Sequence, residues 1–361
     1  MITSELYQKD LFSYSAVKSI EEKFKELDEP DFFIKKYNSY VVFELYQHFA
    51  TKKKLSSLAD CGTYLGFDLY KHISKEEYQK RLSGANFCRD RFCDMCNWRR
   101  ARKYAIENFK LLKYIQSKEK VRYIFATFTI KNPRVEELKD YVKLFNRAWQ
   151  RMTQTKRWRN SILGYIKAIE IPFQKTDKRY INLHAHCLFI VPSIYFDKKY
   201  DLYIKQSEFQ EMWQKALRVD YNPSVDIRII KPNKNRNEDD EIVSVVAETT
   251  KYPLKSVDLH GIDWRVFKEL VEQTKNMRFL SFGGIAKLYR CEIFGSEEFD
   301  DSDLIGDYDE LDLSVWEKIG KLWYSLEAGK YVLHRFVPEK NEENLNKKSI
   351  KNNEKIMKER G

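Results

Sequence analysis

Ile181-Asn-Leu-His-Ala-His-Cys-Leu-Phe-Ile-Val191 has the alternating pattern of a β-strand. Every second residue from Leu183 to Val191 is apolar, so one face of this strand is suited to a core. The other face would carry two imidazoles side by side near one end, from His184 and His186. The pattern therefore predicts a strand built into a sheet, with a histidine pair on its second face.

A third candidate metal ligand precedes the histidine pair. Segment 164–173 is typical of a neighbouring strand and contains one carboxylate, Glu170, while the polar connection 174–180 has the length of a hairpin loop. A His-x-His pair alone is a weak signal, because two histidines on a strand can also be half-exposed polar residues. Two imidazoles and a carboxylate suit Mg²⁺ or Mn²⁺ and would also accept Zn²⁺, Co²⁺ or Ni²⁺.

The charge of the chain indicates a polyanionic partner. The 361 residues, enough for two or more modules, carry a formal net charge of +11. Segment 297–312 holds nine carboxylates and no Lys or Arg, so the rest of the chain carries +20. Basic segments rich in Tyr, Phe and Trp favour single-stranded DNA or RNA, although a basic surface can also serve solubility alone.

Neither a signal peptide nor a membrane span is expected. The first ten residues lack an apolar core of signal-peptide length, and no apolar run approaches the ~18 residues of a transmembrane helix. We therefore expect a cytoplasmic protein, in which cysteines serve metal binding or burial rather than disulfides.

Three cysteines with the spacing Cys88-x4-Cys93-x2-Cys96 predict a structural zinc site. Cys61 is the first choice for the fourth ligand and His72 the second. We call segment 86–100 the zinc knuckle. It leads into a basic helix that is expected to reach about residue 116. The knuckle and this helix together could contact DNA, or the zinc site could serve only to stabilise the structure. The basic residues that open the helix are Arg99, Arg100 and Arg102.

The remaining elements are predicted from hydrophobic periodicity and turn residues. Strands are expected at 122–131, 225–230 and 277–285, and helices at 135–153, 207–218 and 263–274, the last with Asp263 as N-cap. The basic and aromatic stretch at the end of helix 135–153 and just after it supplies further candidate DNA contacts: Arg151, Arg157 and Trp158. Lys251 and Lys255 are also candidate DNA contacts.

Segment 242–255 contains a glutamate and a tyrosine four residues apart, Glu248 and Tyr252, which would share one face of a helix. Its apolar residues could equally form a strand, and Pro253 disfavours helix at Tyr252. We interpret the segment as a helix that ends near Lys251.

These motifs in this order resemble the plasmid rolling-circle replication initiators of the HUH endonuclease superfamily, in the branch found on small plasmids of Gram-positive bacteria. The motifs are Phe125-Ala-Thr-Phe-Thr-Ile130, Glu170, Leu183-His-Ala-His-Cys187 and Glu248-Thr-Thr-Lys-Tyr-Pro-Leu-Lys255, preceded by the zinc knuckle. The resemblance covers roughly residues 60–290. Two positions depart from the usual pattern, because Ala185 and Asp94 stand where such proteins often have Pro.

The resemblance implies an α+β fold with a central five-stranded antiparallel sheet and packed helices. It also implies that Tyr252 nicks one DNA strand at a plasmid origin, that Glu248 acts in termination, and that a host helicase assists. A phenol has a pKa of about 10, so attack at neutral pH needs help, and the metal, Lys251 and Lys255 are candidates to favour the phenolate.

Four regions are expected along the chain: a mostly helical extension at 1–60, a zinc module with its basic helix at 61–112, the catalytic domain at 113–292, and an acidic loop, aromatic segment and charged tail at 293–361. Two alternatives to an initiator stay open. One is a related HUH relaxase or single-strand transposase, and the other is a zinc-dependent nucleic-acid-binding regulator without catalysis.

Overall fold

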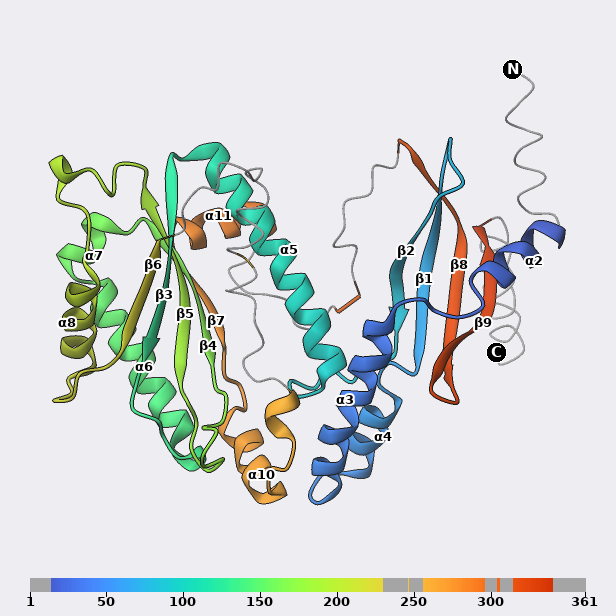
Figure 1. Ribbon diagram of the computed structural model, residues 1–361, viewed down its shortest axis with the longest axis horizontal. Coiled ribbons are helices and arrows are strands. Elements are labelled where there is room, and N and C mark those ends of the chain that lie inside the picture. Colours follow the sequence, from blue (N-terminus) through green and yellow to red (C-terminus); the bar gives the residue numbers. More distant parts are fainter. Residues whose placement is uncertain (1–13, 230–245, 247–255, 296–303, 306–313, 340–361) are drawn as a thin grey trace, which may run out of the picture.

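The computed structural model describes residues 14–229, 246, 256–295, 304–305 and 314–339. It is an α+β structure with two antiparallel sheets in two neighbouring lobes (Figure 1). The first sheet has the strand order β6-β3-β5-β4-β7. Its strands are β3 (Val121–Thr129), β4 (Gly164–Glu170), β5 (His184–Pro192), β6 (Val225–Ile229) and β7 (Leu280–Gly284).

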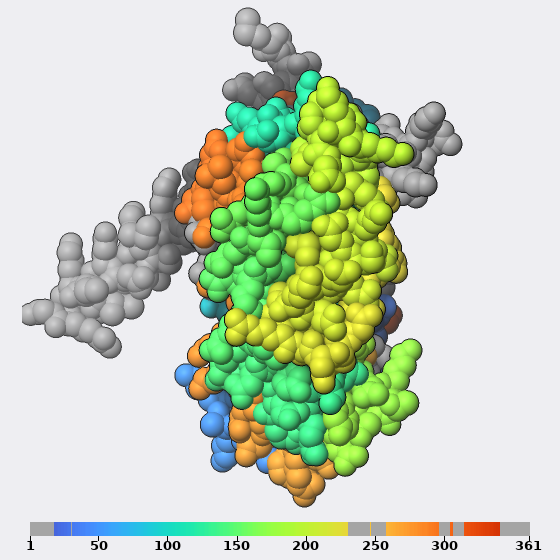
Figure 2. Space-filling model, turned by 90° about the vertical axis from the view of Figure 1, so that its left-hand side faces the viewer, coloured from blue at the N-terminus to red at the C-terminus, as the bar shows by residue number. Residues whose placement is uncertain are grey.

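The apolar face of β5 packs under a layer of helices. Every second residue from Leu183 to Val191 is fully buried, as the alternation predicts. The covering helices are α6 (Leu138–Thr153), which follows the short 3-10 helix η1 (Val135–Glu137), then α7 (Lys156–Ser161) and α8 (Gln206–Leu217). Beneath this layer the ring of Phe128 contacts Trp149 and Trp213, and Trp149 also contacts Phe189. Figure 2 shows the outside of the helix layer.

The second face of β5 is only partly covered by helices. Leu188 and Ile190 join an apolar cluster with residues of α5 (Asp94–Lys118) and α11 (Ile285–Phe294). His184 and His186 lie on the same face, at the end of the strand beyond this cluster. One sheet face therefore serves as core along one half and carries a polar site along the other.

The sequence-based elements of this lobe are mostly confirmed. The strands at β3, β4, β5 and β6 and the helices α6 and α8 lie where periodicity predicts them. Asp263 caps α10 (Trp264–Gln273) by accepting a hydrogen bond from the backbone N–H of Arg265. Helix α11 was missed, because its first residues continue the apolar pattern that was assigned to strand 277–285. The expected helix at 242–251 lies outside the described residues, except for Val246, which is helical.

The second lobe joins two distant parts of the chain in a sheet of order β2-β1-β8-β9. Its strands are β1 (Tyr64–His72), β2 (Tyr78–Ala85), β8 (Trp316–Glu327) and β9 (Lys330–Pro338). The division expected from the sequence placed β1 and β2 in the zinc module and the β8–β9 hairpin in the aromatic segment of region 293–361, so it did not anticipate this pairing. Pairing between segments some 250 residues apart leaves no local pattern, so the sequence could not indicate it.

Helices of the N-terminal extension complete this lobe, namely α2 (Tyr14–Lys23), α3 (Pro30–Gln47) and α4 (Lys52–Asp60). Phe32 of α3 packs edge-on against Phe67 of β1. At its other end, α3 meets the first lobe, because Tyr46 contacts the ring of Phe267 in α10. No helix in the described part of the chain is long and apolar enough to cross a membrane.

Lys167 of β4 is a buried cation in the aromatic core. It is 4% exposed, and its Nζ donates a 2.7 Å hydrogen bond to Oδ1 of Asn146. The rings of Phe145 and Trp149 lie 5.7 and 5.1 Å from the ammonium. Burial lowers the pKa of Lys167 to about 8 from its usual 10.5, because the charged form loses its hydration.

We expect Lys167→Met to be more stable than the wild type at pH 7, with an advantage that shrinks as the pH rises from 8 to 10.5. In that window the unfolded wild type binds a proton that the folded protein has released, so wild-type stability rises relative to the variant by about 3 kcal/mol. Urea unfolding at several pH values measures this difference. A constant gap between the two proteins across the window contradicts it.

Candidate active site and metal centres

Glu170, His184 and His186 converge on one point at one end of the interior strands β4 and β5. The pairing of β4 with β5 places Glu170 directly opposite His184. Nε2 of His184 lies 3.3 Å from Oε2 of Glu170, and Nε2 of His186 lies 3.4 Å from Oε1. The three side chains are 13–15% exposed, so the cluster is sheltered but reachable from solvent. Such a group can hold one divalent cation.

The second nitrogen of each imidazole is held by a neighbouring group. Nδ1 of His184 lies 2.8 Å from the carbonyl oxygen of Asn182, and Nδ1 of His186 lies 3.1 Å from Oγ1 of Thr127. Phe125 stacks on the His186 ring at 5.3 Å. These contacts direct both Nε2 atoms at Glu170, which is the arrangement that metal-binding histidines usually have.

The electrostatics of Glu170 fit a cation. Burial acts to raise the pKa of this carboxyl, but hydrogen bonds and charge from His184 and His186 outweigh it and lower the pKa to about 2. Both carboxylate oxygens face an imidazole nitrogen, and Oε1 is buried from solvent. A divalent ion would satisfy this carboxylate and both imidazoles, and the mixed N/O set suits Mg²⁺ or Mn²⁺.

A second candidate metal centre consists of four cysteines, Cys61, Cys88, Cys93 and Cys96. Their sulfurs lie within 4.8 Å of one another. The Sγ–Sγ distances are 3.6 Å for Cys61–Cys93, 3.5 Å for Cys61–Cys96 and 3.6 Å for Cys88–Cys96. A Zn–S bond of about 2.3 Å gives a tetrahedron with edges of roughly 3.8 Å, so the four thiols fit zinc closely.

The structure separates the two candidates for the fourth zinc ligand. Cys61 belongs to the cluster, whereas the ring of His72 contacts Trp316 and Ser74 in the second lobe. Hydrogen bonds from the other three thiols lower the pKa of Cys88, whereas contacts within the same cluster raise the pKa of Cys93 and of Cys96. A thiolate is the form that binds zinc.

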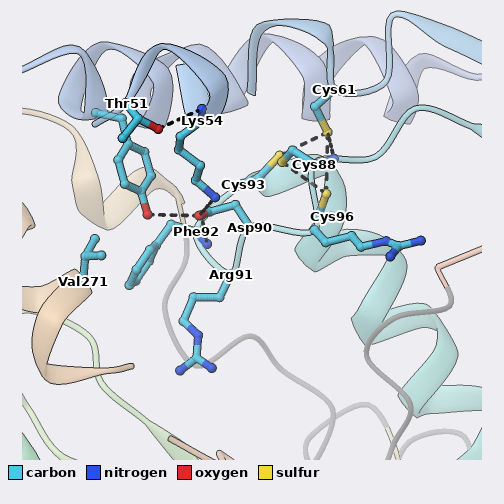
Figure 3. A network of polar contacts seen from close by, with 12 residues as sticks. Thr51, Lys54, Cys61, Cys88, Asp90, Arg91, Phe92, Cys93, Cys96 and Val271 are labelled. Atoms are coloured by element: carbon cyan, nitrogen blue, oxygen red, sulfur yellow. Dashed lines mark hydrogen bonds and ion pairs between the residues drawn. The ribbon is translucent and has the colours of Figure 1, made fainter. Parts of the chain in front are cut away.

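The loop of the zinc knuckle is bonded to both lobes, and Figure 3 shows Asp90 of this loop beside Lys54. Oδ2 of Asp90 accepts a 3.0 Å hydrogen bond from Tyr46 and pairs with Nζ of Lys54 at 2.6 Å. Arg91 reaches the other lobe, where it donates to the carbonyl oxygens of Thr274 and Met277 at 2.6 and 3.2 Å. The knuckle thus ties α3 and α4 to the end of α10.

Most residues expected to contact DNA make contacts within the protein. Trp158 is 4% exposed and packs on Trp149, so that prediction is corrected: no ring face is left for a base. Four arginines donate to backbone carbonyls, namely Arg99 to Leu304, Arg100 to Arg89 and Asp90, Arg151 to Ala216, and Arg157 to Tyr203. Arg102 is exposed. Glu248, Lys251, Tyr252 and Lys255 lie outside the described residues.

Comparison with known proteins identifies the family. Residues 79–332 match the model of a replication protein family. The chain belongs to this family. It is 30% identical over 277 residues to "Protein rep" of Streptococcus pneumoniae serotype 2, covering 76% of this chain and 83% of that protein. It is 32% identical to "Protein rep" of Lactiplantibacillus plantarum, covering 75% and 86%.

Membership of the replication protein family confirms the expected relationship to the plasmid rolling-circle replication initiators. A third relative, "Protein rep" of Lentilactobacillus hilgardii, is 31% identical over 76% of its length. No solved structure matches the chain significantly.

Sequence reasoning missed the groups that orient the site. Thr127 was seen only as part of a strand, although its β-strand pairing sets it opposite His186. Lys36 of α3 was not noticed; it is 2% exposed and donates to the carbonyl oxygen of Ala59, and burial lowers its pKa while the nearby thiols act to raise it. Both depend on contacts between distant segments.

We expect Cys93→Ser to lose the bound zinc and to lower the stability of both lobes, because the knuckle joins them. Zinc content by mass spectrometry and the midpoint of urea unfolding measure the two effects. Cys291→Ser is the matched control, since Cys291 lies outside the cluster. Wild-type protein purified without zinc, or equal unfolding of Cys93→Ser and the control, contradicts the zinc model.

Proposed function

We propose that this chain is a plasmid rolling-circle replication initiator that nicks and rejoins one strand at the plasmid origin. The observation that carries the proposal is the convergence of Glu170, His184 and His186 on one point in a half-open site. Membership of the replication protein family supplies the DNA substrate.

The path of the chain supports Tyr252 as the nucleophile. Val246 is 3% exposed and packs in one cluster with Ile166 and Leu188. Leu188 shares its strand face with His186, two residues earlier. Tyr252 follows Val246 by six residues, and a chain of that length can span up to about 20 Å, which is long enough to bring the phenol to the metal site.

In the proposed reaction the phenol oxygen of Tyr252 attacks a backbone phosphorus and the bond from phosphorus to the 3′ oxygen breaks. The phenol loses its proton, the 3′ oxygen gains one, and the 5′ end stays linked as a phosphotyrosine ester. A bound Mg²⁺ or Mn²⁺ would polarise the phosphate and offset its developing charge. Because the ester replaces the broken bond, attack by a 3′-hydroxyl can reverse the step without ATP.

The metal ligands have distinct tasks in this scheme. Glu170 neutralises part of the cation charge and stays ionised at neutral pH, as its lowered pKa requires. Thr127 and Asn182 keep the two imidazoles aimed at the same point. Lys251 and Lys255 flank Tyr252 in sequence and would favour its phenolate form.

Cleavage of a labelled single-stranded origin oligonucleotide tests the proposal. We expect a nick at one position with added Mn²⁺ and a covalent protein–DNA adduct. Binding without any cleavage in Mg²⁺ or Mn²⁺ would instead favour a zinc-dependent regulator. Cleavage of a transfer origin or of transposon ends, but not of a replication-origin hairpin, would favour a relaxase or transposase.

We expect Tyr252→Phe to abolish the covalent adduct while origin binding stays within about twofold of wild type, because only the attacking oxygen is removed. The adduct is measured by denaturing gel electrophoresis, and binding by fluorescence anisotropy. Tyr200→Phe, at an exposed tyrosine of the same lobe, serves as the control and should form the adduct normally. An undiminished adduct from Tyr252→Phe rules out this nucleophile.

We expect Glu248→Ala to nick at near-wild-type rate but to terminate poorly, because its carboxylate would activate the water that ends the cycle. Plasmid replication in cells should then produce multimeric single strands in place of monomeric circles. Southern blotting of the single-stranded products measures the ratio. A normal yield of monomeric circles refutes this role.

A further inference from the structure

The four-stranded sheet of the second lobe has one core face and one outer face. Leu65, Phe67 and Leu69 of β1 point into the core, where Phe67 meets Tyr324 of β8 and Phe32 of α3. Their alternate neighbours in β1 point to the other side. This other side, which we call the outer face, combines aromatic and charged side chains from all four strands.

An aromatic layer lies at the centre of the outer face. The rings of Tyr64 and Trp323 are stacked at 5.2 Å with an interplanar angle of 15°, and His334 of β9 adds an imidazole 6.3 Å from Tyr64. A Cβ at Gly66 would come within 2.3 to 2.7 Å of three atoms of the Trp323 ring. Gly84 leaves a similar space, so two glycines let the indole lie against the sheet backbone.

Cationic side chains surround this layer. Arg335 is exposed and pairs in register with Trp323, and Lys321 pairs in register with Asp68 across β8 and β1. The guanidinium of Arg81 lies 5.5 Å from the ring of Tyr70. Lys318 is shared between the carboxylates of Asp68 and Glu339 at 3.5 and 3.4 Å. Among these four cations, Arg335 is the one that is largely exposed.

We propose that the outer face is a second DNA-binding site that takes single-stranded DNA, with bases stacked on Tyr64 and Trp323 and phosphates near Arg335 and Lys321. Tyr64 and Trp323 are half-buried, and aromatic rings with cations beside them bind unpaired bases in a sequence-tolerant way. Duplex DNA hides its base faces, so it offers this surface only phosphates. The site lies on a different sheet from Glu170, His184 and His186.

The inference rests on the proposed function in one respect, that the polyanion is DNA. Nicking and strand displacement produce a single strand, and a second site could hold it while the 5′ end stays attached to Tyr252. The occupant is therefore single-stranded DNA, and duplex DNA or RNA are alternative outcomes of the test.

Binding of a labelled 20-nucleotide oligo(dT) to the full-length protein, measured by fluorescence anisotropy without added Mg²⁺ or Mn²⁺, tests the proposal. We expect Tyr64→Ala to raise Kd about tenfold through loss of stacking, while Tyr64→Phe keeps the wild-type Kd. Arg335→Glu should raise Kd by a similar factor and make binding less dependent on salt.

Two controls match these changes. Tyr37→Ala removes a tyrosine that is 66% exposed on α3 of the same lobe, and Lys215→Glu reverses a charge on α8 in the other lobe. Both should bind oligo(dT) like wild type. Unchanged Kd values for Tyr64→Ala and Arg335→Glu, or equal losses in the controls, overturn the proposal. Tighter binding of duplex DNA or of oligo(U), with the same dependence on Tyr64, overturns the choice of occupant.

The proposed function and this inference can be disproved independently of each other. His184→Ala should bind oligo(dT) normally and cut nothing, whereas Tyr64→Ala should still cut a short nick-site oligonucleotide at saturating concentration. If the wild type binds oligo(dT) through Tyr64 but never nicks DNA, the proposed nuclease function is wrong and the second DNA-binding site stands. If the wild type nicks DNA but Tyr64→Ala binds oligo(dT) like wild type, the nuclease function stands and the second site is wrong.

Discussion

The antiparallel register of three adjacent strands is the constraint on which the site depends. β5 pairs with β4 so that His184 faces Glu170, and with β3 so that His186 faces Thr127. A slip of one residue would move the carboxylate and the imidazoles to opposite faces of the sheet. The buried side chains of β5 prevent that slip, because it would also expose Leu183, Cys187 and Phe189.

The same sheet face has two uses, and this division explains where chemistry can occur. Along one half, Leu188 and Ile190 are sealed under α5 and α11. Along the other half, His184 and His186 stay partly exposed beside Glu170. Rigid packing on one half holds the ligands in place on the other, so the geometry needs little rearrangement when a cation binds.

The zinc knuckle gives the site a second support. Through Asp90 it is bonded to α3 and α4, and through Arg91 to the chain just after α10. The residues from Ser256 to Gln273, which form η3 (Ser256–Leu259) and α10, follow directly after the segment that carries Tyr252. In the proposed mechanism the knuckle would therefore steady α10, which follows the segment that carries Tyr252.

Local patterns in the sequence predicted much of the lobe that is built on the five-stranded sheet. Period-two alternation located β3 and β5, and an apolar stripe located α6, because these signals arise within a few residues. The histidine pair, Glu170 and Cys61 could be proposed from residue type and spacing. The β1–β8 pairing, the burial of Trp158 and the role of Thr127 could not, since each depends on contacts between remote segments.

Anomalous X-ray scattering from crystals soaked in Mn²⁺ tests the central claim most directly. The account predicts one manganese peak about 2.2 Å from Nε2 of His184, Nε2 of His186 and a carboxylate oxygen of Glu170. Crystals that hold manganese elsewhere, with the carboxylate still paired directly with both imidazoles, would contradict it.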